Sequence, residues 1–338
     1  MTHYEKRAAE ILAGMTDKEK VGQVFLAHCP DGGGKEIFAE YQFGGVLAFA
    51  REFEKRTPEE ARALFAGQNS VSKLPLLVAV DEEGGTVVRV SKFEQYRKER
   101  FPSPKDLFAA GGWRGIAGDT REKCALLRSV GINYNLAPVC DYSLDETAFI
   151  SKRVFGRSAE ETARFISSVV RTMKKEKIAC SLKHFPGYGG NSDTHLDMAC
   201  DVRPFEAFEK EDLLPFIAGI KAGAQSVMVA HNIVNCIDPE YPASLSVPVH
   251  RLLRETLGFR GVIITDSLTM NAIRHFTNGA DPCVRALLCG NDMLITASTT
   301  KGADAVYEAL KTGELPRDIL DRAVTNVLIM KQKIGILR

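Results

Sequence analysis

The chain has 338 residues, of which 45% are hydrophobic and 26% charged, with a formal net charge of +1. These values are typical of a globular protein, and the short basic runs also contain glutamates, which speaks against nucleic-acid binding. No window is long and apolar enough for a membrane span and the N-terminus lacks the apolar core of a signal peptide, so we expect a cytoplasmic protein with no membrane partner.

Eight short apolar runs recur along the chain, usually separated by a polar loop and an amphipathic stretch. They are rich in Val, Ile and Leu and mostly continuous rather than alternating, which is typical of parallel strands buried on both faces. The runs span residues 21–27, 44–49, 74–80, 132–139, 178–185, 225–231, 261–266 and 293–297.

Helical periodicity fills most of the gaps. The stretch 57–71 begins with a threonine cap followed by proline. The stretch 158–178 begins at Ser158, and Glu161 three residues later predicts a reciprocal capping box. Two more amphipathic stretches cover residues 208–223 and 318–335.

The alternation of strands and helices predicts an α/β fold, a TIM-like (β/α)8 barrel formed by one domain over residues 1–338. A doubly wound open sheet is the alternative, but no GxGxxG follows the first strand. Residues 91–115 are predicted to be the longest irregular insertion.

Polar residues follow the strands at one end of this predicted barrel, where the catalytic groups of such barrels lie. Carboxylates and imidazoles that converge there suggest a site for a neutral, hydroxyl-rich ligand. The residues at these strand ends are Asp81, Asp141, Lys183, His184, His231 and Asp266.

Several of these residues also have a purely structural interpretation. Asp266 could cap the following helix, and Asp81 could cap a turn at Gly84 and Gly85. His231 could be a core histidine that hydrogen-bonds to the backbone. Lys183 follows five apolar residues, so its ammonium group must either reach solvent or pair with an acid.

The segment KHFPGYGGNSDTH at residues 183–195 concentrates proton-handling groups on a glycine-rich loop. Asp193 and His195 are two residues apart, so in an extended conformation both point to the same side. Asp193 could then accept the Nδ1–H of His195 and fix its tautomer, as the carboxylate of a hydrolase triad does. An Asx turn at Asp193 is the alternative.

Three motifs in this order resemble glycoside hydrolase family 3, in its single-domain β-N-acetylglucosaminidase branch: LLVAVDEEGGTVVRV (76–90), SLKHFPGYGGNSDTH (181–195) and LGFRGVIITDSLTM (257–270). A weaker motif, RVFGRSAE, lies at 153–160. The chain departs from the family pattern at Tyr188, where a histidine is frequent, and in a spacing from Gly189 to Asp193 that is one residue shorter.

The resemblance implies a TIM-like barrel with Asp266 as the nucleophile and an acid/base dyad of Asp193 and His195. The chain ends soon after its last predicted helix, so we expect the proton donor to come from the barrel loop rather than from a second domain. The residues implied to bind the sugar are Asp81, Arg89, Arg153, Lys183 and His184.

We therefore expect a retaining exo-β-N-acetylglucosaminidase that acts on muropeptides or chito-oligosaccharides, with no metal and no organic cofactor. A β-glucosidase, another β-hexosidase or a β-glycoside phosphorylase of the same family is the nearer alternative. A catalytically silent sugar-binding barrel and a metal-dependent amidohydrolase-type barrel are more remote. The eight scattered cysteines have no metal-ligand spacing and indicate reduced thiols, and the oligomeric state stays open.

Overall fold

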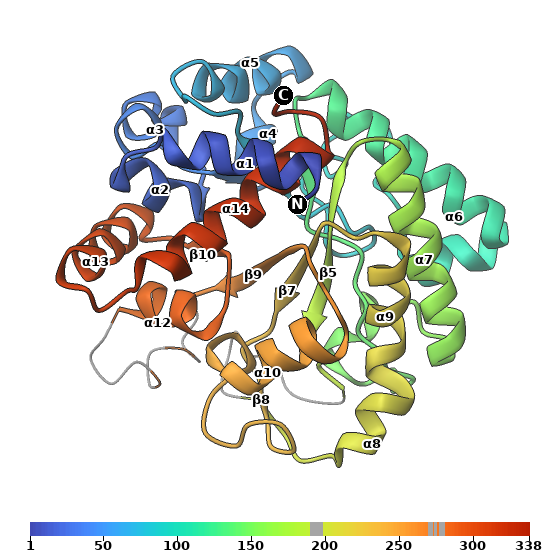
Figure 1. The fold of residues 1–338 in the computed structure, drawn as a ribbon. Helices are drawn as coiled ribbons and strands as arrows, with labels where there is room; N and C mark the ends of the chain where they lie inside the picture. The colour runs from blue at the N-terminus through green and yellow to red at the C-terminus, as the bar shows by residue number, and fades with distance from the viewer. Residues whose placement is uncertain (190–198, 270–272, 274–275, 277–280) are drawn as a thin grey trace.

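The computed structural model describes residues 1–338 except 190–198, 270–272, 274–275 and 277–280. Within that part of the chain, eight strands close a barrel in the order β1-β10-β9-β7-β5-β4-β3-β2. Every neighbouring pair is parallel, and the connections between strands run through helices on the outside (Figure 1). The predicted (β/α)8 barrel is confirmed, whereas the assignment of 1–338 to a single domain stays a prediction.

Each of the eight apolar runs supplies one barrel strand. The strands are β1 (Phe25–His28), β2 (Gly45–Ala48), β3 (Leu77–Val80), β4 (Tyr134–Asn135), β5 (Ala179–Phe185), β7 (Ser226–Val229), β9 (Val262–Ser267) and β10 (Met293–Thr296). A separate parallel pair is formed by β6 (Cys200–Asp201) and β8 (Ile233–Val234).

The helices surround the barrel, and several of them begin with a side-chain cap. In helix α5, Thr57 and Glu60 form a capping box and Pro58 occupies the first turn, as its sequence predicts. The described helices are α1 (His3–Ala13), α2 (Asp17–Gln23), α3 (Lys35–Tyr41), α4 (Arg51–Glu54), α5 (Pro58–Asn69), α6 (Pro104–Ser129), α7 (Ala159–Lys175), α8 (Phe205–Ala207), α9 (Leu213–Ala222), α10 (Val247–Arg251), α12 (Pro282–Cys289), α13 (Thr299–Thr312) and α14 (Arg317–Lys333).

Two local predictions are wrong. The insertion predicted at 91–115 is irregular only as far as Ser103, because Ser103 caps α6 and Pro104 starts it, and the helix is interrupted at Gly112. Ser158 does cap α7, but Glu161 pairs with Arg157 at 2.9 Å instead of completing the capping box.

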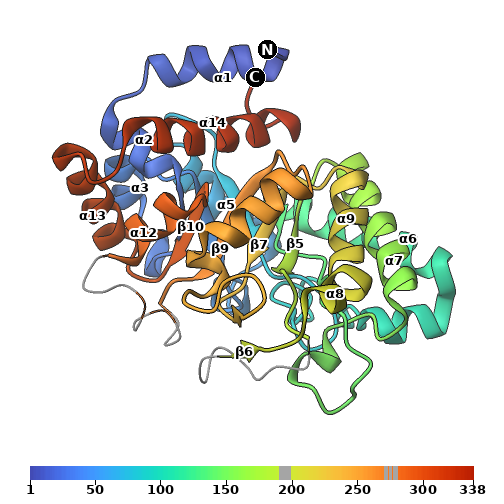
Figure 2. The ribbon, with the colours of Figure 1, turned by 60° about the horizontal axis from the view of Figure 1, so that its bottom comes forward.

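The interior of the barrel is a packed apolar core. Side chains from the strands, such as Leu77, Tyr134 and Ile264, belong to one apolar cluster with Val327 and Met330 of α14, which covers one end of the barrel. Helices α1 and α14 contact each other across this closed end, whereas β6 lies at the opposite end (Figure 2). None of the helices in the described ranges is long and apolar enough to cross a bilayer.

Candidate active site

The open end of the barrel contains a cavity of about 300 Å³ at the carboxyl ends of the strands. Asp266 reaches it from β9, Lys183 and His184 from β5, and Asp81 from the residue after β3. Arg89 and Arg153 enter from the loops that follow β3 and β4. The structure thus brings together six of the eight site residues predicted from the sequence.

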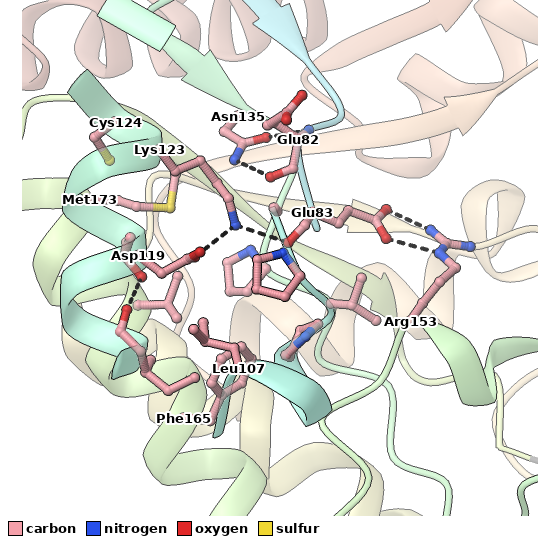
Figure 3. A pocket seen from close by; sticks show the side chains of 18 residues that line it. Glu82, Glu83, Leu107, Asp119, Lys123, Cys124, Asn135, Arg153, Phe165 and Met173 are labelled. Carbon is pink, nitrogen blue, oxygen red and sulfur yellow. Dashed lines mark hydrogen bonds and ion pairs between the residues drawn. The ribbon is translucent and has the colours of Figure 1, made fainter. Parts of the chain in front are cut away.

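A buried ion-pair network organises one wall of this cavity, and its centre is Glu83, a residue that the sequence did not single out. Lys183 Nζ lies 2.6 Å from Asp81 Oδ1 and 2.7 Å from Glu83 Oε1. The Arg153 guanidinium donates to both Glu83 oxygens, at 2.7 and 2.9 Å (Figure 3). We call Asp81, Glu83, Arg153 and Lys183 the Glu83 network.

The network keeps its buried members ionised. Burial alone would raise the pKa of Glu83, but the charges of Lys183 and Arg153 outweigh it and hold that pKa well below its ordinary value. Burial alone would lower the pKa of Lys183, but Asp81 and Glu83 raise it. Glu83, Lys183 and Arg153 therefore stay charged beside the cavity, where they can hydrogen-bond a polar ligand.

His184 is fixed in orientation by Asp141. Its Nδ1 lies 2.7 Å from Asp141 Oδ2, so the ring donates there, and Nε2 lies 3.3 Å from an Arg153 nitrogen, where it accepts. Asp141 also accepts the backbone N–H of His184 and, at 2.9 Å, that of Tyr188. The buried Asp141 carboxylate thus hydrogen-bonds both to His184 and to Tyr188, which lies a few residues before Asp193 and His195 in the chain.

Glu82, which is fully buried, accepts hydrogen bonds from the loop that carries Arg89. One Glu82 oxygen accepts the backbone N–H groups of Arg89 and Val90, each at 2.8 Å. The other oxygen accepts the Ser91 hydroxyl. Arg89 in turn places its guanidinium 3.9 Å from Asp81, so the adjacent acids Glu82 and Glu83 support two different parts of the cavity wall.

Asp266 lies near the end of β9, and its Oδ1 accepts the backbone N–H of Ser267 at 2.7 Å. The Ser267 carbonyl in turn lies 3.0 Å from His231 Nε2. His231 is fully buried and also contacts the Ser244 hydroxyl at 2.7 Å, which confirms its interpretation as a core histidine. This histidine supports the backbone beside Asp266.

Part of the cavity wall is apolar, formed by Leu47, Phe49, Met228 and Ile295. His28 belongs to this wall and packs edge-on against Phe49. Burial, followed by the charge of Arg51, lowers the pKa of His28 to about 4, so this imidazole is neutral at physiological pH. The cavity therefore offers an apolar surface as well as charged hydrogen-bonding groups.

The positions of the predicted residues decide several open alternatives. Lys183 pairs with acids rather than reaching solvent, and Asp81 binds Lys183. Asp193 and His195 lie outside the described residues, so their predicted pairing stays a prediction. Glu83 carries no distinguishing signal in the sequence, since two glutamates followed by two glycines are typical of a solvated turn.

Comparison with known proteins shows which family the chain belongs to. A β-hexosaminidase of Xylella fastidiosa (strain 9a5c) is 35% identical over 274 residues, covering 78% of each chain. One of Nitrosomonas eutropha is 30% identical over 282 residues, covering 79% of this chain and 77% of the relative. A family 3 β-N-acetylglucosaminidase structure from Paenibacillus sp. str. FPU-7 superposes with a TM-score of 0.88 at 31% identity, covering 96% of this chain but 63% of that one. Because residues 16–330 match the glycosyl hydrolase family 3 N-terminal domain, the chain belongs to that family of glycoside hydrolases.

Proposed function

We propose that the protein is a retaining β-N-acetylhexosaminidase that removes terminal β-linked N-acetylglucosamine. The observation that carries the proposal is that Asp266 opens onto the same cavity as all five predicted sugar-binding side chains. The similar proteins are β-hexosaminidases and a β-N-acetylglucosaminidase, which supports the choice of an N-acetylhexosamine as the substrate.

In the proposed first step, Asp266 attacks the anomeric carbon and the glycosidic C–O bond breaks. His195 gives its proton to the departing oxygen, so a glycosyl ester of Asp266 and a free alcohol result. In the second step His195 takes a proton from water as the water oxygen attacks the same carbon. The ester bond then breaks, and the sugar leaves with its original configuration.

A histidine is suited to this double role. Its unperturbed pKa of about 6.5 is close to neutral pH, so it can both give and take a proton. It also places no second negative charge beside Asp266 while the ester forms. Asp193, two residues before it, would accept the other ring N–H and hold the imidazole in one tautomer.

The charged wall is proposed to bind the sugar hydroxyls. Lys183 and Arg153 donate, and Asp81 accepts, from positions that are already fixed by ion pairs before the substrate arrives. Such preorganised dipoles stabilise a transition state at little cost in reorganisation. Contacts that shorten as the sugar ring flattens would raise kcat more than contacts made equally in the ground state.

The test is a panel of aryl β-glycosides that differ at C2. We expect rapid hydrolysis of the β-N-acetylglucosaminide and much slower hydrolysis of the β-glucoside that lacks the N-acetyl group. The reverse preference would replace the proposal with a β-glucosidase. Adding inorganic phosphate separates the phosphorylase alternative, because a sugar 1-phosphate would then be the product.

The proposed cellular substrates are muropeptides or chito-oligosaccharides in the cytoplasm. The two classes differ in the group attached to the released sugar, which would lie outside the cavity described above. Rates on a purified muropeptide and on chitobiose, measured with the same enzyme preparation, distinguish them.

A further inference from the structure

A second buried ion pair lies outside the candidate active site, on helix α6. Asp119 and Lys123 are four residues apart, and their side chains are only 8% and 11% exposed. Pairs with this spacing usually lie on the solvated face of a helix, where they contribute a few tenths of a kcal/mol. Here the pair faces the barrel, where removing both charges from water is costly, so its position requires an explanation.

Besides pairing with Asp119, the Lys123 ammonium group donates a hydrogen bond to the backbone of the candidate active site. Its Nζ lies 3.2 Å from Asp119 Oδ2 and 3.1 Å from the carbonyl oxygen of Glu83 (Figure 3). The same ammonium group lies 4.9 Å from the centre of the Phe101 ring. The pair therefore presents one directed hydrogen bond to the residue at the centre of the Glu83 network.

The turn at Glu83 has little freedom once this bond is made. Its backbone N–H donates to the Val87 carbonyl at 3.0 Å, while its carbonyl accepts from Lys123. The next residue, Gly84, has φ +110° and leaves no room for a side chain, since a Cβ would lie 2.3 Å from the Pro102 oxygen. The backbone that carries the Glu83 carboxylate is thus fixed on both sides.

The space between Lys123 and the barrel is too small for a second ligand. The cavity there measures about 30 Å³ and is lined mostly by apolar side chains from α6, α7 and the barrel. That volume holds about one water molecule. The buried pair is therefore not the wall of another binding site, and the contact it makes with Glu83 is its distinguishing feature.

We propose that Lys123 is a positioning residue for the candidate active site, acting through Glu83. By fixing the Glu83 carbonyl, Lys123 sets where the Glu83 carboxylate lies, and that carboxylate sets the positions of Lys183 and Arg153. The inference rests on the proposed function, because these two cations are proposed to bind the sugar. Nothing in this role requires Lys123 to touch the substrate.

The test compares two variants that both lack the ion pair. In Asp119→Asn, Lys123 can still donate to the Glu83 carbonyl, whereas in Asp119→Asn/Lys123→Met that donor is gone and no uncompensated carboxylate is left behind. We expect kcat/KM for an aryl β-N-acetylglucosaminide to fall by about 10- to 100-fold between them, the loss typical of a misplaced binding group. Lys123→Arg keeps a cationic donor at this position, so this variant should retain most of the wild-type kcat/KM.

A role through Glu83 also predicts non-additivity. When Glu83→Gln is present in both variants, the step from Asp119→Asn to Asp119→Asn/Lys123→Met should cost less than about twofold in kcat/KM. Wild-type kcat/KM in the folded double variant would overturn the proposal, and so would a full additional loss in the Glu83→Gln background.

Amide hydrogen exchange gives a readout that needs no turnover. Residues 82–90 should exchange faster in Asp119→Asn/Lys123→Met than in Asp119→Asn, while the strands on the far side of the barrel stay unchanged. If the wild-type enzyme cleaves none of the glycosides, the proposed function fails on its own. Unchanged exchange at residues 82–90 would overturn the role of Lys123 in either case.

Discussion

Two buried lysines at opposite ends of the barrel have opposite environments. Lys183, at the open end, is 2% exposed and contacts two carboxylates, which raise its pKa. Lys331, in α14 at the closed end, is fully buried and contacts the neutral Gln23 side chain at 2.7 Å. Burial there lowers the pKa of Lys331 to about 7.

The comparison shows that burial alone does not decide whether a lysine stays charged. A buried lysine stays charged when enough carboxylates lie within hydrogen-bonding distance, because their attraction for the ammonium group has to exceed its loss of hydration. At the open end two acids hold Lys183 as a cation next to the cavity. At the closed end Lys331 has no acid partner among the described residues, and burial favours its neutral form.

The largest effect should come from the residue that gives the open end its chemistry. Asp266→Ala removes the proposed nucleophile and should lower kcat for an aryl β-N-acetylglucosaminide by at least about 10³-fold. Circular dichroism and the melting temperature serve as controls for folding. A folded variant with wild-type rates would remove Asp266 from the mechanism.

His195→Ala should have an effect that depends on the leaving group. A poor leaving group needs a proton as the C–O bond breaks, whereas an activated aryl group does not. We therefore expect a much larger loss on an alkyl or disaccharide substrate than on a nitrophenyl glycoside. Equal losses on the two substrates would argue against an acid role for His195.

Lys183→Met should harm both stability and activity. The substitution leaves the buried Glu83 and the partly buried Asp81 without this cation, and breaking a buried pair in this way costs about 3–5 kcal/mol. Urea unfolding at pH 7 measures this loss. Lys331→Met is the matched control, because it removes a lysine of similar burial that has no acid partner among the described residues.

The smallest effect is a difference between wild type and Lys331→Met in how the free energy of unfolding depends on pH. Above pH 7 the folded protein holds Lys331 neutral, whereas the unfolded chain keeps it protonated up to its ordinary pKa of about 10.4. The unfolded state then binds more protons, so wild-type stability should rise with pH, by about 1.4 kcal/mol per pH unit relative to the variant. Parallel pH profiles between pH 7.5 and 9.5 would show that Lys331 stays charged in the folded state.

The sequence predicted the barrel because its strands are continuous apolar runs, and the strand-end rule then placed Asp81, Lys183 and Asp266 at one end. It could not reveal Glu83, because two glutamates in a glycine-rich loop look like an ordinary solvated turn. The helix start at Ser103 was missed although a serine cap followed by proline is a recognisable signal. The nearby Gly111 and Gly112 disfavour a helix, so the segment was predicted to be irregular, and Gly112 does interrupt the helix.

The contribution of Lys123 was also invisible in the sequence. A lysine four residues after an aspartate is typical of an exposed helix face, and only the packing of α6 against the β3 loop shows that this pair is buried. Contacts of this kind depend on tertiary structure, since Lys123 and Glu83 are far apart in the chain.

Covalent trapping tests the proposed catalytic role of Asp266 most directly. The enzyme is incubated with a fluorinated N-acetylglucosaminyl fluoride whose glycosyl-enzyme hydrolyses slowly, then digested and analysed by peptide mass spectrometry. We expect one sugar attached to Asp266, and no attachment in Asp266→Ala. A sugar attached to a different residue, or a product released with inverted configuration, would contradict the account.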